Sequence, residues 1–251
     1  MFPFPSALLL NSGASAIHGP ISFVGSGVYS DNTGIGSGRT FNFSSLLDTS
    51  GATPTIAAND VAIAVWCSHA DGADLTIATP TGWTKRQDIY VNNGLDTNLG
   101  TFFKVLDGTE TSATFDGSHA GSGSSGVAGA VFVFRGVDIT TPFDVADQTA
   151  SGTTTGRPNA AAITPSTPGS WIVVACASGG STANYTNPGD LSTTTNQFKS
   201  AHASASNDAV AGIGIKTDWT SGSFDPAQWG GASNTSIFSW AAVTMALRSA
   251  S

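Results

Sequence analysis

The sequence predicts an all-β protein, an antiparallel β-sandwich of the jelly-roll type made of two weakly repeated halves. Three observations support this fold class. The apolar segments are short and rich in β-branched and aromatic residues, Gly, Pro, Asn, Asp and Ser separate them, and one pattern recurs further along the chain. A chain of 251 residues is long enough for one large sandwich, which we expect over 21–251.

The expected strands follow one another with short polar connections between them. They cover residues 39–47, 61–67, 99–106, 110–116, 127–137, 170–177, 210–216 and 236–248. In the last of these, apolar residues occupy both alternating positions: Val243 and Met245 fall on one face, and Trp240 and Ala242 on the other. A strand that is apolar on both faces is expected to be covered on both sides.

A weak internal repeat relates the two parts of the chain. A shift of 109 residues places Cys67, at the end of one expected strand, on Cys176 at the end of another. The same shift places Phe115 on Phe224, each between a hydroxyl residue and an Asp. This period is far longer than the 20 to 50 residues of solenoid repeats or propeller blades.

Two related halves, about 58–140 and 168–248, allow two arrangements. They form either the two packed sheets of one sandwich or two small sandwiches side by side. We favour the single sandwich, because residues 138–170 contain no run of charges and can cross between the sheets as a long Greek-key connection.

Charge and hydropathy exclude several classes of function. Charged residues make up only 10% of the chain, and the net charge is −8. The nine Lys and Arg residues are scattered, whereas phosphate binding needs them clustered, so we expect no nucleic-acid partner. No run approaches the eighteen or so apolar residues of a membrane-spanning helix, and no membrane insertion is expected.

The first 20 residues differ from the rest of the chain. They lack the basic start and long apolar run of a secretion signal. They form either a frayed terminus or an extended docking segment, stiffened by Pro3 and Pro5, that becomes ordered on a partner. The apolar side chains available for docking are Phe2, Phe4, Leu8, Leu9 and Leu10.

One group of motifs resembles a known class of protein. A Pro80–Trp83 turn follows a buried strand and precedes the aromatic strand at 99–108, the strand TFD and the segment 131–144. Together they resemble a β-sandwich of tailed-phage and prophage virion proteins, including tail and head fibres. The resemblance covers 58–145 well and the second half loosely, where 187–192 lacks the Trp.

The resemblance implies a structural role. In that pattern Trp83 packs the turn against the sandwich, and Gly82 allows the sharp bend before it. It also implies a virion component, assembled in the host cytoplasm with other virion proteins as partners. Separately, we expect a symmetric homo-oligomer, for which we favour a trimer. Tail fibre, collar, baseplate and capsid-decoration roles all agree with it.

The chain offers few groups for metal binding. His69, Asp71 and Asp74 lie close together in sequence and have ligand chemistry. Their spacing does not match a calcium-binding loop, and Asp residues in such a turn commonly bond to local backbone groups. We therefore expect no metal and no cofactor.

The sequence also gives no sign of catalysis. His18, His119 and His202 are isolated, and no nucleophile elbow or zinc-protease motif is present. Glu110 is the only Glu, so a glycosidase with paired Glu residues is disfavoured. We predict that the protein is not an enzyme.

The two cysteines permit a bridge or free thiols. Cys67 and Cys176 hold equivalent positions in the repeat, so a disulfide between the halves is conceivable. The cytoplasm is reducing, and a cysteine in an apolar strand is commonly a small buried hydrophobic residue. We favour two free, buried thiols.

Aromatic residues in polar segments suggest an alternative function. Tyr90, Tyr185, Trp219 and Trp229 stand in stretches rich in Gly, Asn and Thr. Exposed rings there can stack on sugars, and Tyr185, Trp219 and Trp229 would then serve a glycan-binding module that recognises a host saccharide. The other interpretation is that they pin their loops to the sandwich. The remaining tryptophans assigned to the core are Trp66, Trp171 and Trp240.

Overall fold

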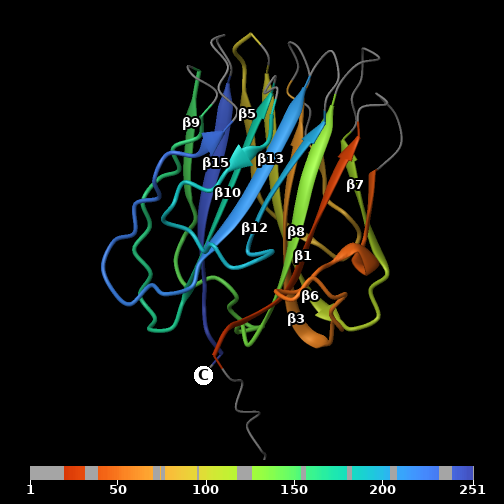
Figure 1. The fold of residues 1–251 in the computed structure, drawn as a ribbon, viewed down its shortest axis with the longest axis vertical. Coiled ribbons are helices and arrows are strands. Elements are labelled where there is room, and N and C mark those ends of the chain that lie inside the picture. The colour runs from red at the N-terminus through yellow and green to blue at the C-terminus, as the bar shows by residue number, and fades with distance from the viewer. Residues whose placement is uncertain are drawn as a thin grey trace, which may run out of the picture.

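Two five-stranded antiparallel sheets packed face to face form the centre of the protein, which confirms the β-sandwich (Figure 1). The first sheet has the order β1 (Ser22–Asp31), β8 (Val127–Arg135), β3 (Ala58–Ser68), β6 (Thr97–Asp107), β5 (Thr84–Val91). The second has the order β12 (Phe198–Ala203), β13 (Ala209–Lys216), β10 (Trp171–Gly179), β15 (Trp240–Leu247), β9 (Gln148–Gly152). This computed structural model describes residues 20–31, 39–69, 74, 77–94, 96–117, 126–153, 157–179, 183–203, 208–231 and 239–250.

A smaller layer covers the outer face of each large sheet. On the first sheet it has the strands β2 (Arg39–Asn42), β7 (Ser112–Gly117) and β4 (Ile77–Ala78), followed in the chain after β2 by a 3-10 helix, Phe43–Ser45. On the second it has the pair β11 (Tyr185–Thr186) and β14 (Gly230–Gly231), with a bridge between Ile163 and Phe224. Three apolar cores result: a central core between the two large sheets, and a first and a second outer core beneath the small layers.

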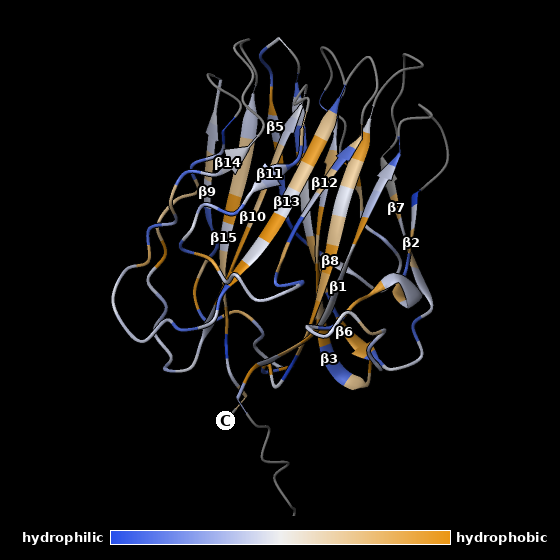
Figure 2. Ribbon diagram, viewed as in Figure 1, coloured by the Kyte–Doolittle hydropathy of each residue, from blue (hydrophilic) through white to orange (hydrophobic). Residues whose placement is uncertain are grey.

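The middle strands are apolar on both faces because each separates two cores. In β3, Val61, Ile63 and Val65 face the central core, while Ala62 and Trp66 face the first outer core. The same alternation holds along β15, where both faces are buried as the sequence predicts. Figure 2 shows apolar residues along the middle strands and polar residues along most of the connections.

The internal repeat is confirmed by the order of the strands. Strands β1, β8, β3, β6 and β5 correspond to β9, β15, β10, β13 and β12, in the same spatial sequence. The registers agree in detail: Lys104 pairs with Ala62 in the first half, as Lys216 pairs with Ile172 in the second. Arg135, the last residue of β8, corresponds in the same way to Arg248, the residue after β15.

The turn before β5 has the structure that its sequence predicts. The Trp83 amide donates to the Pro80 carbonyl at 3.0 Å, and Gly82 has a positive φ of 77°. The Trp83 ring is buried and packs edge-on against Phe115, with ring centroids 5.4 Å apart. In the second half the corresponding segment contains Gly189, with a positive φ of 102°, and the buried Leu191, which packs in the second outer core.

The connection from the first sheet to the second crosses the side of the sandwich. It leaves β8 after Arg135, forms a bridge between Phe143 and Leu247, and enters the second sheet as its edge strand β9. Arg86 holds this connection to β5: its guanidinium donates two hydrogen bonds to Asp147 and lies 3.8 Å from the centroid of the Phe143 ring.

Asp144 is a second anchor of the crossing connection. Its buried carboxylate accepts hydrogen bonds from the backbone and side chains of Ser166 and Thr167 and lies 3.4 Å from the Arg248 guanidinium. Burial alone would raise the pKa of Asp144, but these hydrogen bonds outweigh it, and the pKa is lowered.

The lowered pKa of Asp144 predicts a pH dependence of stability. A carboxyl group whose folded pKa lies below its unfolded pKa stabilises the fold above the unfolded value, and this contribution is lost as pH falls through the folded value. We expect the free energy of unfolding to fall between about pH 5 and pH 2, and to fall less in Asp144→Asn. Urea unfolding at several pH values measures both slopes, and equal slopes would contradict the assignment.

The two cysteines are free and buried, as favoured from the sequence. Cys67, on the first sheet, faces the central core, whereas Cys176, on the second sheet, faces the second outer core. The two side chains therefore lie on opposite sides of the second sheet. The predicted equivalence of Cys67 and Cys176 is wrong by one residue: the strand registers relate Ser68 to Ser178, so Cys67 corresponds to Ala177.

Burial predicts that both thiols are unreactive. Desolvation raises the pKa of Cys67 to about 12 and raises the pKa of Cys176 strongly, and only the thiolate is an effective nucleophile. We expect a thiol-specific chromogenic disulfide reagent to leave the native protein unlabelled and to label both cysteines in urea. Rapid labelling of either thiol without denaturant would show that the cores are not closed as described.

Candidate functional site

The two ends of the described chain lie at one pole of the sandwich. Ser22, the first residue of β1, pairs with Arg135, and the Ala250 amide donates to the carbonyl of the adjacent Gly136. Figure 1 shows the start of β1 and the C-terminal end together at this pole. The proposed docking residues Phe2, Phe4, Leu8, Leu9 and Leu10 lie outside the described residues.

At the opposite pole a buried polar network closes the central core. The Thr97 hydroxyl on β6 accepts from the Gly179 amide on β10 at 2.7 Å, and it contacts the hydroxyl and carbonyl of Ser239. Ser178 donates to the same carbonyl at 2.7 Å. These bonds join the two sheets, and their atoms lie too deep to meet a ligand.

Two of the residues predicted for glycan binding are buried. Tyr185 is 3% exposed and Trp229 is 1% exposed, and their rings meet edge to face with centroids 5.6 Å apart. Trp229 fills the space that Gly212 leaves, since a Cβ there would lie 2.6 Å from its ring. Both rings are therefore buried in the second outer core, as the loop-pinning interpretation requires, and neither is exposed for stacking on a sugar.

Trp219 is half-buried and packs partly against the second outer core. Its indole N–H donates to the Gly222 carbonyl at 3.0 Å. The ring thus holds its own loop, in agreement with the loop-pinning interpretation. Of the other tryptophans, Trp66 is fully buried, while Trp171 and Trp240 are half-buried beside the cores.

The polar residues considered for chemistry do not assemble in the part of the structure that is described. His69 is buried, Asp74 is exposed, and Asp71 lies outside the described residues, as do His18 and His119. No group of three or more potential metal-ligating side chains is found among the described residues. Nor, within the same residues, is there a helix long and apolar enough to span a membrane.

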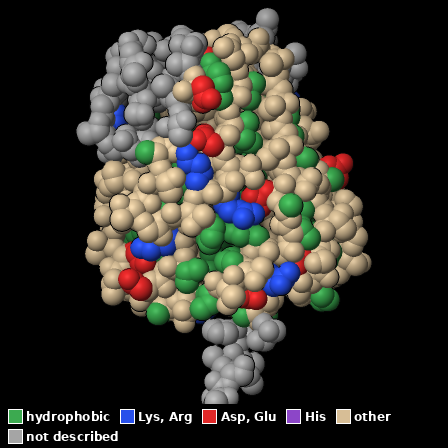
Figure 3. Space-filling view, turned by 180° about the vertical axis from the view of Figure 1, so that it is seen from behind, with side chains coloured by type: hydrophobic (Ala, Val, Ile, Leu, Met, Phe, Trp, Pro, Cys, Tyr) green, Lys and Arg blue, Asp and Glu red, His purple; other side chains and the backbone are tan. Residues whose placement is uncertain are grey.

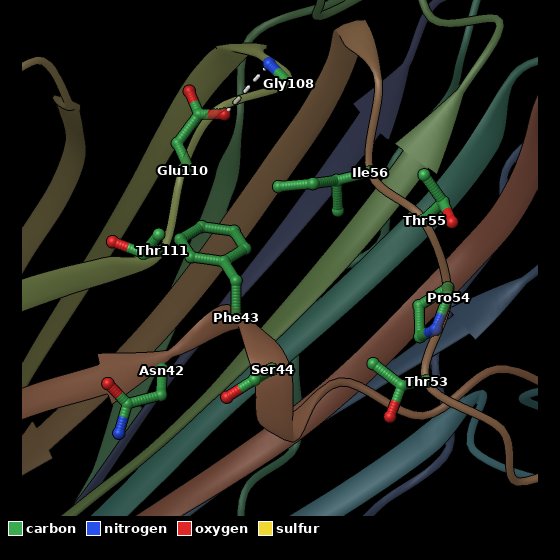
Figure 4. Close-up of a pocket in the computed structure, with 10 residues that line it drawn as sticks. All are labelled: Asn42, Phe43, Ser44, Thr53, Pro54, Thr55, Ile56, Gly108, Glu110 and Thr111. Carbon is green, nitrogen blue, oxygen red and sulfur yellow. Dashed lines mark hydrogen bonds between the residues drawn. The ribbon is translucent and has the colours of Figure 1, made fainter.

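An open cleft with a volume of about 600 Å³ lies on the side of the first half (Figure 4). Three separate connections line it: 42–44 at the end of β2, 53–56 before β3, and Gly108, Glu110 and Thr111 in the β6–β7 turn. The cleft is bounded on one side by a hydrogen bond from the Phe43 amide to the Thr111 carbonyl, 2.9 Å long. None of these lining residues was predicted from the sequence as part of a site.

Glu110 is the charged residue of the cleft. It accepts hydrogen bonds from the amides of Asp107 and Gly108 at 3.0 and 3.1 Å, and its carboxylate lies 3.1 Å from the Lys104 ammonium. Burial opposes ionisation, but these bonds and Lys104 outweigh it, so the pKa of Glu110 is lowered. Glu110, the one Glu of the chain, therefore holds the β6–β7 turn in its ionised form. This disfavours a role as a proton donor.

Comparison of the chain with protein-family models, with curated proteins and with solved structures gives no match. The Pro80–Trp83 turn and the strands around it therefore remain the residues on which the resemblance to phage virion sandwiches rests. The virion role that this resemblance implies stays a prediction.

Proposed function

We propose that the protein is a non-enzymatic structural component of a tailed-phage virion that docks through its N-terminal segment. The observation that carries the proposal is that both ends of the described chain lie at the same pole of the sandwich. The described chain enters β1 and ends beyond β15 at one pole, so residues 1–20 would extend from there toward a partner. The opposite pole and the sides would then face outward.

The distribution of charge supports a structural role over nucleic-acid binding. Seven of the nine Lys and Arg side chains form ion pairs with Asp or Glu, which leaves little positive charge for phosphates. On the face in Figure 3, charged side chains are sparse and scattered among uncharged ones. Such a surface stays hydrated through hydroxyl and amide groups.

Substitution of the five anchors tests the docking segment. In the full chain, Ser at Phe2, Phe4, Leu8, Leu9 and Leu10 is expected to abolish the homo-oligomer, for which we propose a trimer, and to leave the urea midpoint of the sandwich unchanged. Light scattering measures the mass of the wild type and of the variant. A monomeric wild type, or a variant that still forms the same oligomer, would contradict the proposed docking.

The virion role has a direct test of its own. Mass spectrometry of purified tailed-phage particles, produced from the genome that encodes this chain, should detect the protein at a constant number of copies per particle. Its absence from complete particles would contradict the role, whatever the oligomeric state.

A further inference from the structure

We propose that the cleft beside Phe43 and Glu110 binds a neutral saccharide. This site differs from the aromatic residues considered for glycan binding in the sequence, and it goes beyond the structural role proposed above. Its volume of about 600 Å³ lies within the range of about 300 to 1,000 Å³ that is typical of small-molecule sites. The volume alone does not indicate the kind of ligand, whereas the residues that line the cleft do.

The middle of the cleft is apolar. Figure 4 shows the Phe43 ring and the Ile56 side chain reaching into the space between the connections, with Pro54 beside them. Phe43 is held by an edge-on contact with Phe41, with centroids 5.7 Å apart, and by its backbone bond to Thr111. Phe43 itself is only 5% exposed and belongs to the first outer core, so it forms the floor of the cleft. The apolar surface offered to a ligand comes from Pro54 and Ile56, which are half-buried and can pack against the C–H face of a sugar ring.

The rim of the cleft carries uncharged polar side chains that are not already engaged. Within the described part of the chain, the side chains of Asn42, Thr53 and Thr111 make no hydrogen bond to other residues. Their amide and hydroxyl groups both donate and accept. A ligand with many hydroxyl groups can therefore exchange its bonds to water for bonds to this rim.

The charge of the cleft favours a neutral ligand over an anion. Its one carboxylate, Glu110, is balanced by Lys104, which is itself engaged in that ion pair. The amides of Asp107 and Gly108 and the Lys104 ammonium already bind the Glu110 carboxylate, so this group holds the turn and is not needed to bind the ligand. A phosphate, sulfate or carboxylate on the ligand would instead face this negative group.

Saturation-transfer NMR on the full chain tests the proposal. The probes are neutral disaccharides built from glucose, galactose, N-acetylglucosamine or N-acetylgalactosamine. At least one is expected to bind with a dissociation constant on the order of 1 mM or lower. No transfer to any of them would overturn the proposal. So would binding confined to sulfated or carboxylated saccharides, because that would require a positively charged site.

Two variants locate the binding to the cleft. Thr111→Trp fills the cleft without removing the backbone carbonyl that Phe43 uses, and it is expected to abolish binding. The matched control is Thr149→Trp on the exposed edge strand β9, which should bind like the wild type. Binding that survives Thr111→Trp, or that is lost equally in the control, would contradict the assignment.

A further variant tests the hydrogen-bonding rim while preserving its shape. The double substitution Thr53→Val and Thr111→Val removes two hydroxyl groups and is expected to weaken binding by about tenfold. Urea midpoints close to the wild-type value would show that each variant is folded. Unchanged affinity in the folded double variant would show that these hydroxyls do not contact the ligand, against the proposal.

Discussion

Replacing Arg86 by alanine is expected to lower the free energy of unfolding by about 3 kcal/mol. The reason is that the Asp147 carboxylate would remain in the variant without its main partner. The Asp147 carboxylate is fully buried, and Arg86 donates to both of its oxygens while Gln87 donates one further bond at 3.2 Å. Without Arg86, a buried charge on the crossing connection loses its main partner, and the stacking on Phe143 is lost too. Urea unfolding measures the loss.

The neighbouring residue supplies a matched control. Lys85 forms an ion pair with Asp88 at 2.6 Å, but both side chains are partly exposed, so Lys85→Ala should cost only about 0 to 1 kcal/mol. If Arg86→Ala costs as little as Lys85→Ala, the connection is not held in the way described. In a double-mutant cycle, adding Asp147→Ala should recover part of the loss, because the uncompensated charge is then removed as well.

Replacing Trp66 by alanine is expected to cost about 3 to 5 kcal/mol, the largest single effect predicted in the first half. Trp66 has no exposed surface and lies stacked between Tyr29 and Phe115, with centroids at 5.4 and 4.6 Å. Gly129 lies against it so closely that a Cβ there would be 2.2 Å from the indole. A site enclosed on so many sides collapses poorly, so most of the cavity would remain.

Trp219→Ala is the control for this second prediction. It removes the same side chain from a half-buried position on a loop, so its cost should be clearly smaller than that of Trp66→Ala. Guanidinium or urea unfolding of both variants gives the comparison. Equal costs would mean that the first outer core contributes less than its geometry indicates.

The middle strands of the two large sheets could be predicted from the sequence, whereas their edge strands could not. Strands β3, β6, β8, β10, β13 and β15 were all expected, and each lies inside a sheet between two apolar cores. The four edge strands β1, β5, β9 and β12 were not expected. Edge strands carry polar and half-exposed residues, as in Lys85 to Asp88 of β5, so they lack the apolar signal that the prediction relies on.

The repeat was found from sequence, but its shift was not constant. The strand registers give a shift of 110 residues for β3 and β10, where Ser68 corresponds to Ser178. They give 112 for β6 and β13, where Lys104 corresponds to Lys216. Connections of different length between the strands change the shift, and one residue of error moves a side chain such as Cys176 to the other face.

The candidate site was beyond sequence reasoning for a geometric reason. The cleft is formed by the connections near Phe43, Ile56 and Glu110, which are brought together by strand pairing rather than by any local motif. The burial of Tyr185 and Trp229 was left open for a similar reason. Tyr185 begins β11 and Trp229 directly precedes β14, and these strands have only two residues each, too short to leave a pattern in a sequence.

The central claim is that two repeated sheets fold as one sandwich around a shared core. Fluorine NMR of the protein labelled with fluorinated tryptophan tests it most directly, because Trp66 reports on the first half and Trp229 on the second. Replacing each by Phe assigns its signal. We expect both native signals to disappear at the same urea concentration. Loss of one signal while the other stays native would contradict a single cooperative sandwich.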